Sequence, residues 1–184
     1  MTSKEIKANV IGGMVIRLTF DGGFQRSKIY KPNVSDAKRK EFRAFLTSEL
    51  PKILLAIERR KKYNDRDHCK MIEKFSSNVS CRFSTIIHKK KFRIGNAQKF
   101  LNLYWKVAWL SKTTSLKPIH CPFDSIIMKK LPKNVRVSWT QFDTIEEYKA
   151  LVKAAKETGG KHRTIADWEM KIYWDAINSG KQNA

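Results

Sequence analysis

The sequence predicts a mainly α-helical protein, a single helical domain with a small β-hairpin near its N-terminus. Three observations support this fold class. After residue 35, apolar residues recur at intervals of three and four, the spacing of one helix face. Ser, Asp or Thr precede several of these segments, where helix N-caps are expected. One earlier apolar segment is interrupted by Asp21-Gly22-Gly23, a sequence typical of a hairpin turn.

The chain length favours one domain. A chain of 184 residues is long enough to bury a sizeable core. We expect a single domain over residues 1–184, with a β-hairpin at residues 14–30. Residues 35–131 are expected to form a helical core with a basic face, and residues 139–179 the C-terminal helices.

The expected hairpin has two apolar, β-branched strands, residues 14–20 and 24–30, on either side of the turn. A two-stranded hairpin is marginally stable alone, so it should pack on helices.

Helical patterns follow the hairpin. Ser35 is a candidate N-cap for the first helix. Pro51 predicts a break in this helix because proline has no N–H to donate, and a second short helix should then cover residues 52–62. Residues 65–83 predict another helix with one apolar face.

The helix expected over residues 96–110 is apolar around most of its circumference, so it should run through the middle of the domain. One polar stripe remains: Gln98, Asn102 and Lys106 recur at four-residue intervals, with Lys99 beside them. On a buried helix such a stripe faces a polar cavity, a partner or a hydrogen-bonded network. The alternative is a stripe that merely reaches solvent.

The last third of the chain predicts three more helices. Pro122 suits the first turn of a short helix and places Asp124 near its N-terminus, where the helix dipole favours a carboxylate. Thr144 with Glu147 forms a capping box that opens the next helix, and Thr164 opens the last one.

The charge of the chain predicts an anionic partner. Its formal net charge is +21 and its pI is near 10.1, and self-repulsion of this size is usually offset by nucleic acid or, second, by an anionic membrane. The aromatic content of 11% argues against a disordered basic tail. No apolar run is long enough to span a bilayer, and the N-terminus lacks the apolar segment of a signal peptide. We therefore expect a soluble cytoplasmic protein, associated with the nucleoid if it is bacterial.

Basic residues gather just before the central helix. Lys89, Lys90, Lys91 and Arg93 lead into Gly95, so this turn is expected to contact backbone phosphates. A solvated loop is the alternative.

Several catalytic classes find little support. His120 lies beside Cys121, but adjacent side chains usually point apart, and the cysteines lack zinc-ligand spacing. Asp124 is the only acidic residue between Glu73 and Asp143, whereas a two-metal nuclease gathers several carboxylates. We expect free thiols, no metal and no cofactor.

A single carboxylate in a cationic and aromatic setting suits cleavage of an N-glycosidic bond. The sugar gains positive charge as the base leaves, and one carboxylate, here Asp124, can stabilise it or activate water. The base would be flipped out and stacked on an aromatic ring. The expected base pocket comprises Gln98, Lys99, Asn102, Trp105 and His120. Core packing is the alternative for the aromatic residue.

The residues at 94–99 (Ile-Gly-Asn-Ala-Gln-Lys) and 122–127 (Pro-Phe-Asp-Ser-Ile-Ile) resemble the core of the helix-hairpin-helix DNA glycosylases. The resemblance implies that Gly95 ends a hairpin that binds phosphate through main-chain N–H groups and that Asp124 is the catalytic carboxylate. Bifunctional members of the family carry a nucleophilic lysine where this chain has Ala97, so the resemblance implies a monofunctional glycosylase.

The expected function is therefore DNA binding with excision of a damaged or modified base. The expected partner is double-stranded DNA rather than single-stranded DNA, then RNA, with no membrane. The oligomeric state stays open. The alternative is a non-enzymatic basic nucleic-acid-binding protein, such as a host-defence, phage or nucleoid factor, in which Asp124 is only a helix cap.

Overall fold

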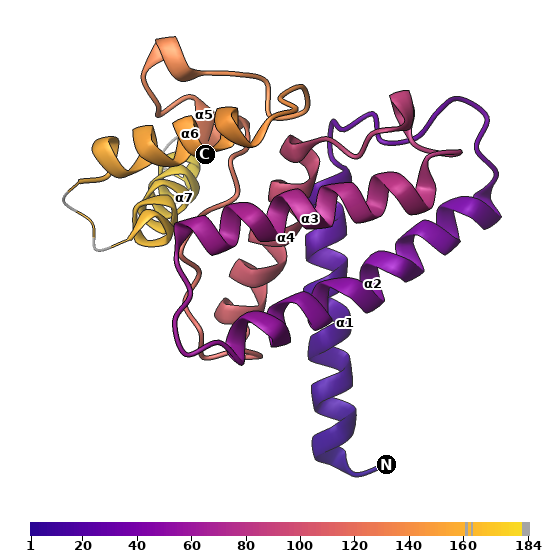
Figure 1. Ribbon diagram of the computed structural model, residues 1–184. Helices are drawn as coiled ribbons and strands as arrows, with labels where there is room; N and C mark the ends of the chain where they lie inside the picture. The colour runs from indigo at the N-terminus through magenta and orange to yellow at the C-terminus, as the bar shows by residue number, and fades with distance from the viewer. Residues whose placement is uncertain (161, 163, 182–184) are drawn as a thin grey trace.

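The computed structural model describes residues 1–160, 162 and 164–181, and helices make up most of this part of the chain (Figure 1). The expected mainly α fold is confirmed. The α-helices are α1 (Ser3–Phe24), α2 (Asp36–Glu58), α3 (Asp65–Phe83), α4 (Ile94–Leu110), α5 (Ser125–Met128), α6 (Ile145–Thr158) and α7 (Ile165–Lys181). Within the same described residues, the 3-10 helices η1 (His88–Lys90) and η2 (Lys133–Val135) lie between α-helices.

The predicted hairpin at residues 14–30 is wrong, because α1 continues through Asp21-Gly22-Gly23 to Phe24. The two glycines allow α1 to approach α4 closely. A Cβ atom on Gly22 would lie 2.4 Å from the Leu103 side chain, and one on Gly23 would lie 2.6 Å from the Phe100 ring. These glycines therefore serve helix packing rather than a turn.

A small part of the expected extended structure remains. Tyr30 and Ile87 form an isolated antiparallel bridge, and the His88 N–H donates to the Ile29 carbonyl at 2.7 Å. This bridge holds the segment after α1 beside η1.

The predicted break at Pro51 is also wrong, since α2 runs without interruption from Asp36 to Glu58. Proline removes one hydrogen bond from a helix, but the buried face continues across it. Leu46, Leu50 and Leu54 are at most 6% exposed. Their burial on both sides of Pro51 offsets the missing bond.

The other long helices agree with the sequence. The structure places α3 at Asp65–Phe83, as predicted, and α4 begins two residues earlier than expected. Capping boxes open α3 at Asn64 and α6 at Thr144. Local capping signals thus set these boundaries.

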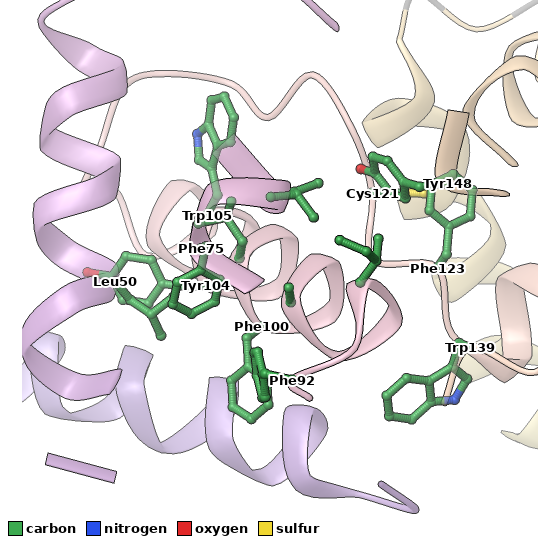
Figure 2. Packing of buried hydrophobic residues seen from close by; sticks show 14 of the residues in the cluster. Leu50, Phe75, Phe92, Phe100, Tyr104, Trp105, Cys121, Phe123, Trp139 and Tyr148 are labelled. Atoms are coloured by element: carbon green, nitrogen blue, oxygen red, sulfur yellow. The ribbon is translucent and has the colours of Figure 1, made fainter. Parts of the chain in front are cut away.

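Helix α4 lies at the centre, packed mainly against α1 and α3. Figure 2 shows Phe92 and Phe100 together on one side of it and Cys121, Phe123 and Tyr148 in a second group. The Phe92 and Phe100 ring centroids are 5.9 Å apart, and those of Phe123 and Tyr148 are 5.7 Å apart. The central helix is therefore buried on both sides, as its composition predicted.

The N-terminal half of α1 projects away from the other helices (Figure 1). Apolar side chains along α1 are exposed: Ile6, Val10, Met14 and Leu18. None of the helices of the described residues is both long and apolar enough to cross a membrane.

Candidate nucleic-acid interface

Asp124 is the N-cap of α5, and both of its carboxylate oxygens accept hydrogen bonds. Its Oδ1 accepts hydrogen bonds from the backbone N–H groups of Ile126 (2.9 Å) and Ile127 (3.1 Å). Its Oδ2 accepts from Lys99 Nζ (2.9 Å) and from the Tyr173 hydroxyl (2.5 Å). Asp124 therefore faces the polar stripe of α4, and each of its oxygens already has two donors.

The Asp124 carboxylate is charged although it is buried. Burial alone would raise its pKa, but the Lys99 ammonium and the Tyr173 hydroxyl outweigh burial and hold the pKa below its ordinary value. The Lys99 ammonium also lies 5.4 Å from the Trp139 ring centroid. The Lys99–Asp124 ion pair thus joins α4 to the start of α5, and the Tyr173 hydroxyl joins α7 to the same carboxylate.

A second ion pair holds α7 against α4. Lys106 Nζ lies 2.5 Å from Glu169 Oε1, and Glu169 is 1% exposed. Burial raises the pKa of Glu169, and Lys106 opposes that shift. The Lys106 ammonium also lies 4.0 Å from the Tyr173 ring centroid. The polar stripe of α4 therefore serves contacts within the fold.

Gln98 ties the start of α4 to the segment before α5. Its Nε2 donates to the carbonyls of Gly95 (3.1 Å) and Phe123 (3.0 Å). Its Oε1 accepts from the Phe123 N–H (3.1 Å) and from Asn102 Nδ2 (3.2 Å). Every polar atom of this buried side chain thus has a partner.

Asn102 continues the network towards α3. Its Oδ1 lies 2.6 Å from His68 Nε2, and His68 Nδ1 lies 3.0 Å from the Tyr63 hydroxyl. Since Asn102 Oδ1 can only accept, the His68 proton resides on Nε2 and Tyr63 donates to Nδ1. Burial lowers the pKa of His68 to about 3, and repulsion from a protonated His120 would act in the same direction. The His68 ring is therefore neutral.

A second branch of the network reaches the surface. Asn102 Nδ2 donates to the Tyr148 hydroxyl (3.0 Å), which lies 2.8 Å from His120 Nδ1. His120 Nε2 lies 3.1 Å from Asp65 Oδ1. The carboxylate can only accept, so Nε2 carries the His120 proton. Burial lowers the pKa of His120, and the hydrogen bond to Asp65 opposes that shift.

Among the expected base-pocket residues only Lys99 contacts Asp124, and all five lie in the interior. Trp105 is 1% exposed, and its Nε1 donates to the Leu116 carbonyl (2.8 Å). The other four, Gln98, Lys99, Asn102 and His120, are at most 5% exposed. A flipped base could enter only by displacing these hydrogen bonds.

A basic pocket of about 230 Å³ lies at the N-terminus of α4. Three segments far apart in the sequence form it: the segment after α1, the segment from η1 into α4, and the loop at residues 138–142. The lining residues are Arg26, Lys28, His88, Lys91, Arg93, Asn96, Thr140 and Gln141.

Arg93 links two walls of the basic pocket. Its Nη1 donates to the carbonyls of Thr140 (3.3 Å) and Gln141 (3.0 Å). Asp143 is the carboxylate next to it, 3.6 Å from Arg93 Nε and 3.8 Å from Lys91 Nζ. These contacts hold the 138–142 loop against the start of α4.

Gly95 supports this pocket in a way that differs from the expectation. Its N–H donates to the Phe142 carbonyl (3.2 Å), so that N–H is already bonded and is not available to a phosphate. A Cβ atom at position 95 would lie 1.8 Å from the Trp139 carbonyl oxygen. Glycine is thus required because the loop passes so close.

Of the four basic side chains expected to contact phosphates, Lys91 and Arg93 line the basic pocket. Lys89 and Lys90 lie in the adjacent turn, exposed, with left-handed backbone angles (φ 52° and 57°). The lining residues that the sequence did not reveal are Arg26, Lys28, Asn96, Thr140 and Gln141, whereas His88 begins the basic run that leads into Gly95. The basic character of Arg26 and Lys28 was the available signal, but the expected strand placed them elsewhere.

None of the three cysteines lines the basic pocket. Cys69, Cys81 and Cys121 are free thiols, as expected. No group of three or more His, Cys, Asp or Glu side chains in the described part of the chain could hold a metal ion. No protein-family model, no curated protein and no solved structure matches this chain.

Proposed function

We propose that this protein binds nucleic acid through its phosphate groups at the basic pocket and the surface beside it. The observation that carries the proposal is the convergence of Arg26 and Lys28 with Lys91 and Arg93, from segments about 60 residues apart, beside the carboxylate of Asp143. Like charges repel each other, so bound phosphate would stabilise this arrangement.

The surface beside the basic pocket extends the same charge. Lys89 and Lys90 are exposed, and neither forms an ion pair with a described residue. A left-handed backbone is uncommon for residues other than glycine, so the turn holds both residues in a defined position. The backbone of a strand that leaves the pocket could run over this turn.

Base excision at Asp124 is the second candidate, because Asp124 lies against Lys99 on the side of α4 that carries the polar stripe. Catalysis would require Asp124 to release Lys99 or Tyr173 and accept a water or a sugar instead. The interior network makes binding without excision the better-supported proposal.

The test of binding is a salt titration. Fluorescence anisotropy is measured with one labelled sequence as duplex DNA, as single-stranded DNA and as RNA. If the protein contacts several phosphates, the logarithm of the binding constant should fall linearly with the logarithm of the salt concentration. The affinity should drop by about 10³-fold or more between about 50 and 200 mM salt. Affinity that stays constant over this range would overturn the proposal. Phosphatidylserine vesicles form the membrane arm, and binding to vesicles but to no nucleic acid would also overturn it.

Matched variants locate the surface. Arg26→Gln/Lys28→Gln removes two charges at the basic pocket. Lys4→Gln/Lys7→Gln removes two exposed charges near the far end of α1, roughly 30 Å away at about 1.5 Å per helical residue. The pocket variant should weaken binding and reduce the salt slope by about 1 to 2, and the control should not. Equal losses in both variants would overturn the assignment of the surface.

A further inference from the structure

The basic pocket differs from a flat cationic surface in having a buried polar residue in its wall. Of its eight lining residues, Asn96 is the buried one, at 5% exposure. The Asn96 Oδ1 atom has no hydrogen-bond partner among the described residues. A buried amide oxygen of this kind is uncommon in proteins, because leaving it unpaired costs about 1–3 kcal/mol. Because Asn96 lines the pocket, a bound group could pair with this amide once the amide rotates about χ2.

We infer that this pocket binds the terminal phosphate monoester of a nucleic-acid strand. The inference rests on the proposed function and specifies which part of the nucleic acid occupies the pocket. Asn96 can contribute in two ways. Rotation of its amide about χ2, a soft two-fold torsion, places Nδ2 as a donor to a phosphate oxygen. A singly protonated monoester can instead donate its P–OH to Oδ1.

The charge of the pocket fits a monoester better than a backbone diester. Arg26, Lys28, Lys91 and Arg93 carry four positive charges against the one negative charge of Asp143, which leaves an excess of three before His88 is considered. A backbone diester carries a single negative charge, whereas a monoester carries about −1.5 to −2 at pH 7 and presents three terminal oxygens. The larger charge makes better use of the converging side chains.

The shape of the pocket leads to the same conclusion. Its volume of about 230 Å³ is several times the roughly 30 Å³ that a water occupies in the liquid, so a phosphate group fits inside. An internal diester has chain on both sides and must pass along a surface. A strand end has chain on one side only, so it can enter the pocket and contact Asn96 in its wall.

The start of α4 adds favourable electrostatics. No side chain of the described residues caps the N-terminus of this 17-residue helix, and a helix N-terminus favours anions. Asn96 lies in the first turn of α4, so a phosphate beside it would be close to the positive end of the helix dipole.

The test compares the ends of one short DNA strand. Three internally labelled oligonucleotides of identical sequence carry a 5′-phosphate, a 3′-phosphate or hydroxyl groups at both ends. Wild-type protein should bind one phosphorylated strand about tenfold more tightly than the hydroxyl-ended strand, equivalent to about 1.4 kcal/mol. Asn96→Asp, which adds a negative charge with little change in size, should abolish this preference. Circular dichroism checks that the variant is folded.

A second variant keeps the test decisive if Asn96→Asp does not fold. Arg26→Gln/Lys28→Gln changes exposed side chains and should reduce the end preference, whereas Lys4→Gln/Lys7→Gln should retain it. Equal affinity for all three strands, with salt-dependent binding preserved, would overturn the terminal-phosphate inference and leave the proposed function standing. The absence of binding to every strand would overturn both. If inorganic phosphate raises the melting temperature while strand ends are not distinguished, the pocket takes free phosphate and the inference fails.

Discussion

Lys99 Nζ lies 2.9 Å from Asp124 Oδ2, and the side chains of this pair are 7% and 10% exposed. Such a pair cannot lose one member without leaving a buried charge. Asp124→Asn should therefore lower the free energy of unfolding by about 3 kcal/mol, measured by urea denaturation. Asparagine is as good an N-cap as aspartate. The loss of stability would therefore come from the unpaired Lys99 charge and not from a weaker helix cap.

The double variant Lys99→Met/Asp124→Asn is the control for the ion pair. It removes both charges and should recover most of the lost stability.

The single variant Asp124→Asn also tests base excision. If wild-type protein forms abasic sites in DNA and folded Asp124→Asn does not, Asp124 is catalytic and binding alone is an incomplete account.

The neutral histidines predict a loss of stability in mild acid. Burial lowers the pKa of His68 to about 3 and also lowers that of His120, whereas an unfolded histidine titrates near 6.5. Unfolding therefore takes up protons below about pH 6.5. The free energy of unfolding should be fully retained above that pH. It should fall by up to about 1.4 kcal/mol per pH unit for each histidine as the pH drops.

Urea denaturation at about pH 7.5 and about pH 5 measures this dependence. His68→Gln should be less stable at neutral pH and should show a shallower decline. If the wild type had the same free energy of unfolding at both pH values, the His68 and His120 rings could not both be neutral in the folded protein.

Two glycines in α1 should respond in opposite directions to replacement by alanine. Gly23→Ala places a methyl group 2.6 Å from the buried Phe100 ring and should destabilise the protein by about 2 kcal/mol. Gly12→Ala meets nothing within 4 Å and should stabilise it by about 0.5–1 kcal/mol through helix propensity. Thermal unfolding measures both. A stabilised Gly23→Ala variant would be incompatible with close packing of α1 on α4.

Gly95→Ala should combine a structural and a binding effect. Its methyl group would lie 1.8 Å from the Trp139 carbonyl oxygen, so the 138–142 loop must move. We expect a loss of about 3 kcal/mol in the free energy of unfolding and a weaker preference for phosphorylated strand ends, because Thr140 and Gln141 line the pocket. Unchanged end preference would show that the loop is not needed for binding.

The sequence predicted those helices whose boundaries depend on nearby residues. Helix α6 begins with a capping box, and α3 carries an apolar face that recurs within its 19 residues, so a short window contains each signal. The hairpin prediction failed because the function of Gly22 and Gly23 depends on Leu103 and Phe100, about 80 residues later. Pro51 was misjudged for a similar reason, since burial of its helix outweighs a local preference.

The candidate site was likewise predictable where it depends on nearby residues and not where it depends on distant ones. The polar stripe on α4 was visible, and its burial followed from the apolar residues around it. The basic pocket was visible only in part, because Arg26 and Lys28 meet Lys91 and Arg93 only when α1 is packed along α4. Asn96 gave no signal, since an asparagine in a sequence does not reveal whether its amide finds a partner.

The close approach of Gly95 to Trp139 limits how this protein can diverge. No side chain fits at position 95 while the 138–142 loop keeps its path, and the loop also supplies Thr140 and Gln141 to the pocket. A descendant that changed Gly95 alone would lose both the fold of the loop and that wall of the pocket. The start of α4 and the 138–142 loop should therefore change together during evolution, and the pocket should be retained or lost as one unit.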